Sequence, residues 1–191
     1  RPSVTDSCKF SSAVGAPHRG ANLSTNNASQ NHSPRLRKGR FSEKYGLYLI
    51  TKCITNDSLL TDSQKSDICS AFIHLREQKD IFLHAFVVMP DHWHALFSIN
   101  SGKDLPKVVE TINRRASFNS RKSRKIIAWQ AGYHDRKIRT NESVVDIVKY
   151  IGGNPVRKQF VLEPAEWKWS SRHELYCEGL DRTFLGTERW E

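Results

Sequence analysis

The chain has 191 residues, of which 38% are hydrophobic and 10% aromatic, so it can build one modest hydrophobic core. Thirty Lys and Arg residues against twenty Asp and Glu residues give a net charge of +10. Such a surplus is typical of proteins that bind a polyanion such as nucleic acid, although it also serves solubility alone. No apolar run approaches the roughly 18 residues of a membrane span, and residues 1–20 lack the apolar stretch of a secretory signal. We therefore expect a cytoplasmic protein without a membrane segment.

Three regions of different composition divide the chain. Residues 1–40 are rich in Ser, Asn, Gly, Pro and Arg and have almost no apolar periodicity, which predicts a disordered basic tail. We expect one folded domain over residues 41–156 and a C-terminal extension over residues 157–191 that packs on it. The four cysteines form no CxxC pair, which argues against a structural zinc site. A disulfide framework is not expected without an export signal.

The first two elements of the folded domain are a strand and a helix. Residues 46–54 alternate in polarity and are rich in β-forming residues, which predicts a strand. Residues 59–80 predict an amphipathic helix that is capped by Thr61 or Asp62. The apolar stripe of this helix consists of Ile68, Ala71, Phe72 and Leu75.

A hairpin follows this helix. Residues 81–88 form a continuous apolar run, which is typical of a buried strand. Residues 92–99 alternate as a second strand, and the tight turn at residues 89–91 joins the two. We therefore expect the two strands to pair.

The remaining elements are two helices with a weaker strand region between them. Residues 104–122 predict a helix, residues 125–130 and 135–140 predict short strand pieces, and residues 141–156 predict the last helix. The order is strand, helix, strand, strand, helix, strand, helix. This order predicts an α+β fold, a ferredoxin-like or RRM-like sandwich with an antiparallel central sheet and helices on one face.

His92 and His94 are the first candidates for chemistry. Residues two apart in a strand point to the same face, so the two imidazoles can chelate one divalent ion. Trp93 then points to the other face, into apolar packing. A histidine–apolar–histidine triplet also arises by chance, so the pattern alone leaves both a metal site and an incidental pair open.

Tyr150 and Asn154 are the second candidate pair, because residues four apart share a helix face. Pro155 disfavours helical geometry at Asn154, and Gly152 and Gly153 loosen the same turn. We therefore expect the helix to end here and to leave Asn154 in a frayed last turn. Taken alone, the pair is better explained as a tyrosine at a helix edge and an asparagine C-cap.

Two longer segments resemble a known family. AFVVMPDHWHALFSI, at residues 85–99, resembles the HUH motif segment of the single-strand tyrosine transposases. KYIGGNPVRKQFVLEPAEWKWSS, at residues 149–171, resembles the tyrosine segment of their REP-associated branch, and GYHDRKIR is similar to the segment before it. The resemblance covers about residues 41–175, and the motifs come in the family's order and spacing. It implies an HUH transposase domain over residues 41–156.

The resemblance also implies a reaction and its residues. Tyr150 matches the catalytic tyrosine, His92 and His94 match the catalytic, metal-binding histidines, and Asn154 matches the third metal ligand. The implied reaction is cleavage and transfer of single-stranded DNA at a REP-like hairpin through a 5′-phosphotyrosine. The implied cofactor is Mg²⁺ or Mn²⁺, with no other small molecule, although two imidazoles also suit Zn²⁺ or Ni²⁺. The C-terminal extension favours a monomer over a dimer.

Basic residues before the tyrosine helix are the candidates for DNA binding. Phosphate contacts by such residues position a strand without reading its sequence. Tyr133 and His134 could stack on unpaired bases. The alternative is a solvated helix face and a charged turn. The candidates are Arg114, Arg115, Arg121, Lys122, Arg124, Lys125, His134, Arg136 and Arg139.

Two other functions stay open. One is a domesticated relative that binds DNA hairpins without cutting them. The other is an RNA-binding sandwich in which the histidines are incidental. The RNA-binding alternative requires aromatic residues on the central strands that can stack on bases, and Trp93 and Phe97 share a strand face.

Overall fold

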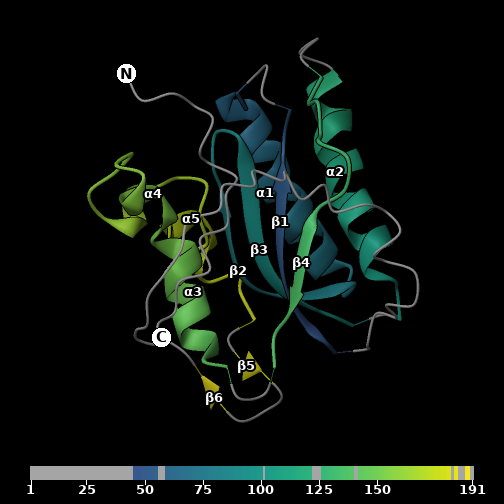
Figure 1. The fold of residues 1–191 in the computed structure, drawn as a ribbon, viewed down its shortest axis with the longest axis vertical. Coiled ribbons are helices and arrows are strands. Elements are labelled where there is room, and N and C mark those ends of the chain that lie inside the picture. The colour runs from purple at the N-terminus through teal and green to yellow at the C-terminus, as the bar shows by residue number, and fades with distance from the viewer. Residues whose placement is uncertain are drawn as a thin grey trace, which may run out of the picture.

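The computed structural model describes most of the predicted domain and extension (Figure 1). The predicted tail at residues 1–40 lies outside the described residues, and so do Lys122, Arg124 and Lys125. The described residues are 45–55, 59–100, 102–121, 126–139, 142–181, 183–184 and 188–189.

The centre of the molecule is a four-stranded antiparallel sheet with the strand order β2-β3-β1-β4. Its chain order is β1, α1, β2, β3, α2, β4, which is the ferredoxin-like arrangement. The predicted α+β class is confirmed, and β2 and β3 have the predicted bounds. The strands are β1 (Leu47–Cys53), β2 (Ile81–Val88), β3 (His92–Ile99) and β4 (His134–Lys137).

Helices α1 (Asp62–Glu77) and α2 (Leu105–Arg121) cover one face of the sheet. The α1 helix begins with a capping box. The hydroxyl of Thr61 accepts from the backbone N–H of Gln64, and the side-chain oxygen of Gln64 accepts from the backbone N–H of Thr61. The ring of Phe72 on α1 meets Trp93 of β3 edge-on, with the centroids 5.2 Å apart. Trp93 is fully buried, as its place in the alternating pattern predicted.

Helix α3 (Val144–Gly152) lies on the opposite face of the sheet. The ring of Tyr150 on α3 contacts that of His94, whose side chain points away from the Trp93 side of β3. The sequence predicted helices on one face. The α1 and α2 helices follow that prediction, while α3 adds a third layer.

The chain after α4 (Asn154–Arg157) runs along the β2 edge of the sheet. The Val88 backbone donates to the carbonyl of Trp169 at 2.8 Å, and the Ser171 backbone donates to that of Phe86 at 2.9 Å. This segment contains a 3-10 turn, η3 (Pro164–Glu166), and the short helix α5 (Glu174–Cys177). Strands β5 (Thr183–Phe184) and β6 (Glu188–Arg189) pair with each other farther on.

The strand predicted at residues 125–130 is wrong for the part that is described. Residues 126–130 make a single isolated bridge, between Ile54 and Trp129. The ammonium group of Lys52 donates to the carbonyls of Gln130 and Gly132, so the chain curves around this cation instead of extending a ladder. Across the described ranges, no helix is long and apolar enough to cross a membrane.

Candidate active site

The side chains of His92 and His94 lie next to each other on the α3 side of β3. Their Nε2 atoms are 3.1 Å apart. Nδ1 of His92 lies 2.6 Å from the Asp91 carboxylate, and Nδ1 of His94 lies 2.7 Å from the Thr51 hydroxyl. Because an ionised carboxylate only accepts, His92 carries a proton on Nδ1 and directs Nε2 toward His94.

This arrangement of the two imidazoles fits a divalent ion. With metal–nitrogen bonds of about 2.0–2.1 Å, two adjacent ligand nitrogens lie about 3.0–3.4 Å apart, and the observed separation is 3.1 Å. Burial lowers the pKa of His94 well below its ordinary value, and the neighbouring His92 and Arg157 lower it further. His94 is therefore neutral, as a ligating imidazole must be. Asp91 and Thr51 hold the outer ring nitrogens and thereby orient both rings.

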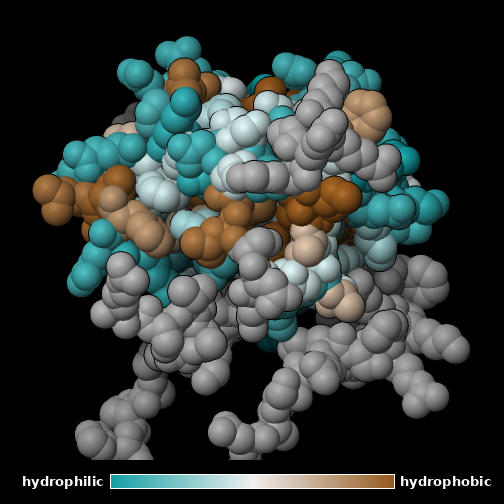
Figure 2. Space-filling model, turned by 90° about the horizontal axis from the view of Figure 1, so that it is seen from above, coloured by the Kyte–Doolittle hydropathy of each residue, from teal (hydrophilic) through white to brown (hydrophobic). Residues whose placement is uncertain are grey.

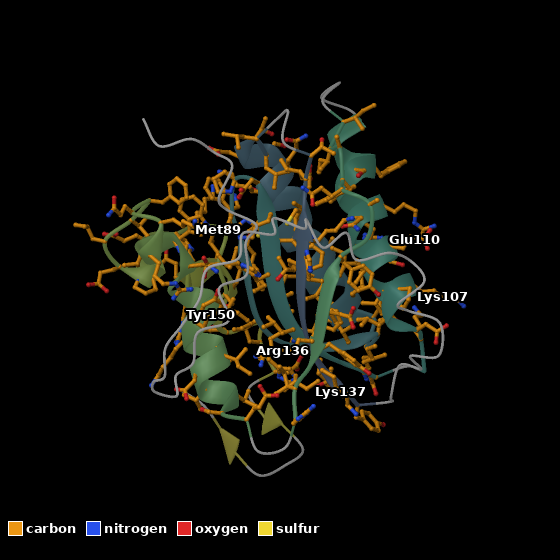
Figure 3. All side chains as sticks on the ribbon, in the orientation of Figure 1. Met89, Lys107, Glu110, Arg136, Lys137 and Tyr150 are labelled. Carbon is orange, nitrogen blue, oxygen red and sulfur yellow. The ribbon has the colours of Figure 1, made fainter. Side chains whose placement is uncertain are left out.

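Tyr150 reaches the histidines from α3. This helix is capped by Ser143, whose hydroxyl accepts from the backbone of Asp146. The ring centroids of Tyr150 and His94 are 6.4 Å apart, with the planes at 61°. Tyr150 is 41% exposed, so a DNA strand can approach this side chain from solvent. Figure 3 shows Tyr150 on the α3 side of the sheet, far from Glu110 and Lys107 on the outer side of α2.

Asn154 lies in an ordered turn, so the prediction of a frayed end is wrong. Pro155 has no N–H to donate to the carbonyl of Ile151, which ends α3 at Gly152. The chain restarts at once as α4, and Asn154 is only 6% exposed. Its side-chain nitrogen has no hydrogen-bond partner within the described part of the chain. A flip of this amide would present its oxygen instead, so Asn154 offers a donor or a ligand one turn beyond Tyr150.

The two glycines before Asn154 admit arginine side chains. A Cβ atom at Gly152 would lie 2.7 Å from Cγ of Arg172, and one at Gly153 would lie 2.9 Å from Nη1 of Arg157. Without a side chain at residue 152, Arg172 of the C-terminal segment packs directly against α3. Without a side chain at residue 153, Arg157 can fold back along α3. Gly152 and Gly153 therefore serve close packing rather than a loose joint.

Arg157, Thr51 and Asp91 also contact the site, although none of them was among the predicted site residues. The guanidinium carbon of Arg157 lies 4.3 Å from the ring centroid of Tyr150, and Nη2 donates to the Tyr150 carbonyl at 2.5 Å. The spacing of seven residues, two helical turns, is the signal that could have indicated Arg157. Asp91 adjoins His92 in sequence. The contact of Thr51 depends on the pairing of β1 with β3 and has no local signal.

The predicted DNA-binding residues fall into two separate groups. Arg114 and Arg115 are exposed on α2, on the opposite side of the sheet from Tyr150. Arg114 lines a cavity of about 410 Å³ together with Trp129 and Tyr133. Arg121 ends α2.

The second group follows β4, on the side of the catalytic candidates. His134 pairs with Thr51, and Arg136 pairs with Leu49. Directly opposed residues share a face, so His134 and Arg136 point to the face that carries His94. Arg136 is held by an ion pair with Glu142 at 2.5 Å, whereas the side chain of Arg139 is exposed.

Comparisons with known proteins identify the family. The family model described as "Transposase IS200 like" matches residues 41–154. A REP-associated tyrosine transposase of Escherichia coli strain K12 is 27% identical over 143 residues, which cover 74% of this chain and 85% of the relative. The solved structure of a REP-associated tyrosine transposase bound to a REP hairpin shares the fold, with a TM-score of 0.60 and 23% identity over 80% of this chain and 96% of that chain. The chain belongs to the IS200-like transposase family.

Proposed function

We propose that the protein is a metal-dependent endonuclease and strand transferase that cleaves single-stranded DNA at a REP-like hairpin through a 5′-phosphotyrosine. The observation that supports this most is the convergence of Tyr150 with the histidine pair, with ring centroids of Tyr150 and His94 only 6.4 Å apart. A protein that only binds hairpins needs no such convergence. The similarity to a REP-associated transposase solved with a REP hairpin supports hairpin DNA as the partner.

Tyr150 is the proposed nucleophile. Its phenol oxygen attacks the DNA phosphorus, the bond to the 3′ oxygen breaks, and the leaving strand ends in a free 3′-hydroxyl. The ester is exchanged rather than hydrolysed, so the phosphotyrosine can be attacked by another 3′-hydroxyl to join strands. An ordinary tyrosine has a pKa of about 10 and is only about 0.1% ionised at pH 7. The nucleophile therefore needs nearby positive charge.

His92 and His94 would hold the metal ion, with Asn154 as the third ligand. No group of three or more His, Cys, Asp or Glu gathers in the described ranges, so a third protein ligand would be of another type, as the Asn154 amide is. A bound Mg²⁺ or Mn²⁺ ion would polarise the phosphate and stabilise the negative charge that develops on it. Asp91 and Thr51 keep both imidazoles aimed at the same point.

The proposal is tested by covalent trapping. A DNA hairpin with single-stranded flanks is incubated with the protein and Mg²⁺ or Mn²⁺, and adducts are separated on a denaturing gel. The wild type forms an adduct, while Tyr150→Phe and a chelated sample form none. His92→Ala abolishes the adduct but leaves hairpin affinity mostly intact. An adduct that survives Tyr150→Phe would overturn the assignment. Tight hairpin binding by the wild type without any adduct would favour the non-cleaving alternative.

The RNA-binding alternative loses its structural basis. It requires exposed aromatic rings on the sheet, but Trp93 and Phe97 are both 0% exposed. Trp93 packs against Phe72 of α1 rather than facing solvent. These rings cannot stack on bases.

A monomeric active site forms part of the proposal. Tyr150 meets His94 of its own chain, because α3 packs on β2 and β3 of the same sheet. Mixing Tyr150→Phe and His92→Ala chains therefore restores no adduct. Recovery of activity in the mixture would show that two chains share one site.

A further inference from the structure

Arg157 places a positive charge beside the tyrosine that none of the roles above uses. Its guanidinium lies over the Tyr150 ring at 4.3 Å and donates to the Tyr150 carbonyl. Gly153 leaves the space for Nη1. No ion pair joins Arg157 to a carboxylate of the described residues. The charge is thus held in place by the backbone while it stays available to an anion.

Phe160, three residues after Arg157 in the sequence, presents an aromatic ring on the surface. It is 51% exposed, and its inner face stacks on Trp167 with centroids 5.4 Å apart and planes at 29°. Leu162, two residues on, is 85% exposed. In the view from above, some hydrophobic residues lie on the left side, the side on which α4 lies in Figure 1, and others lie across the middle of this face (Figure 2).

The position of Phe160 depends on an unfavourable backbone conformation. Gln159 has a φ of 59°, in the left-handed region where glycine is the usual residue. The Phe160 backbone donates to the carbonyl of Pro155 at 2.9 Å, which closes the end of α4 as a Schellman-type turn. This turn reverses the chain and leaves the ring of Phe160 on the surface. Such local strain often accompanies a binding function.

We propose that Arg157 and Phe160 form a binding site for the single-stranded DNA that flanks the hairpin. Arg157 contacts a backbone phosphate beside Tyr150, and Phe160 stacks on an unpaired base. Alternation of a cation for the backbone with an aromatic face for a base is how proteins bind single strands without reading sequence. The inference rests on the proposed function, because it assumes that Tyr150 handles DNA.

Binding measured without cleavage separates this site from the chemistry. All variants carry Tyr150→Phe and are studied in a chelating buffer by fluorescence anisotropy. One probe is a hairpin with single-stranded flanks, and the other is the same hairpin with a blunt end. Phe160→Ala and Phe160→Leu weaken binding of the flanked probe about 5- to 150-fold, the effect of losing one stacked base. Both variants bind the blunt probe as tightly as the parent, and Phe160→Tyr retains its affinity for both probes.

The charge of Arg157 is tested by salt dependence. Arg157→Gln lowers the slope of log affinity against log salt for the flanked probe by about 0.7, the value for one single-strand phosphate contact. Lys158→Gln is the matched control and leaves the slope unchanged.

Three results would overturn the site. These are equal losses for flanked and blunt probes, full affinity of the Leu and Ala variants, and equal slopes for the Arg157 and Lys158 variants. Because metal and nucleophile are absent throughout, a protein that never cleaves DNA can still pass this test. Conversely, a protein that forms adducts can fail it.

Discussion

The two faces of β3 carry different kinds of residue and have different tasks. On the α1 side, Trp93, Ala95 and Phe97 are fully buried and form part of the hydrophobic core. On the α3 side, His92 and His94 are nearly as buried, but they meet polar partners and the ring of Tyr150. Burial without hydrogen bonds or a ligand disfavours polar groups. One face therefore stabilises the fold, whereas the other carries the residues of the proposed chemistry.

The strongest test of this comparison removes one side chain from each face. Trp93→Ala should lower the free energy of unfolding by about 3–5 kcal/mol, because it leaves a large cavity in the core. His92→Ala should lower it by less, about 1–2 kcal/mol, because it removes hydrogen bonds to Asp91 and His94 but leaves a smaller cavity. Urea unfolding in a metal-free buffer measures both. Similar losses in the two variants would show that the α3 side also serves mainly as core.

The two glycines offer a smaller contrast. Gly152→Ala should cost about 1–3 kcal/mol, because its Cβ would meet Cγ of Arg172, in the middle of a packed side chain. Gly153→Ala should cost less than about 1 kcal/mol. Its Cβ meets the Lys149 carbonyl at 3.1 Å and Nη1 at the far end of Arg157, which can shift slightly while Nη2 keeps its hydrogen bond to the Tyr150 carbonyl. Thermal unfolding ranks the two variants. A larger loss at Gly153 would mean that neither Nη1 of Arg157 nor the Lys149 carbonyl can shift to admit the methyl group.

The smallest expected effect is a pH dependence from His84. His84 is the extra residue at an irregularity in β2, where Nδ1 donates to the Asp181 carbonyl and Nε2 contacts the Ser98 hydroxyl. Burial lowers its pKa below the ordinary 6.5, although the Asp181 carbonyl and charge partly offset this. The unfolded chain then binds more protons than the folded one, so stability falls as pH drops below 6.5.

Denaturant unfolding between about pH 7.5 and 5, which spans the ordinary pKa range of histidine, measures the contribution of His84 to stability. The loss of stability on acidification should be smaller in His84→Gln than in the wild type. Equal losses in the two proteins would place the titration elsewhere, for example at His94, whose pKa is also lowered.

The sequence predicted the elements that depend on local pattern. Strands β2 and β3 have the predicted bounds because a short apolar run and an alternating pattern, separated by a tight turn, favour two paired strands. Thr61 is the cap of α1 because its hydroxyl and Gln64 form a local pair. The opposite orientations of Trp93 and His94 follow from the period of a strand alone.

Features that depend on distant contacts could not be predicted in the same way. The side of the sheet that α3 covers depends on the packing of the whole chain. The segment at residues 126–130 has strand-like composition, but Lys52, some eighty residues earlier, donates to the carbonyl of Gln130 at its end and to that of Gly132 beyond it. The glycines at 152 and 153 suggested a loose helix end because the arginines that fill their space were not evident from local pattern. The burial of Asn154 was not evident from local pattern either.

Mapping of the covalent adduct identifies the residue that attacks the DNA. Wild-type protein is incubated with flanked hairpin DNA and Mn²⁺, digested with nuclease and protease, and the nucleotide-bearing peptide is sequenced by mass spectrometry. We predict one modified residue, Tyr150, joined to a 5′ phosphate, and no modified peptide from His92→Ala. Attachment at another residue, such as the half-buried Tyr133 across the sheet, would contradict it.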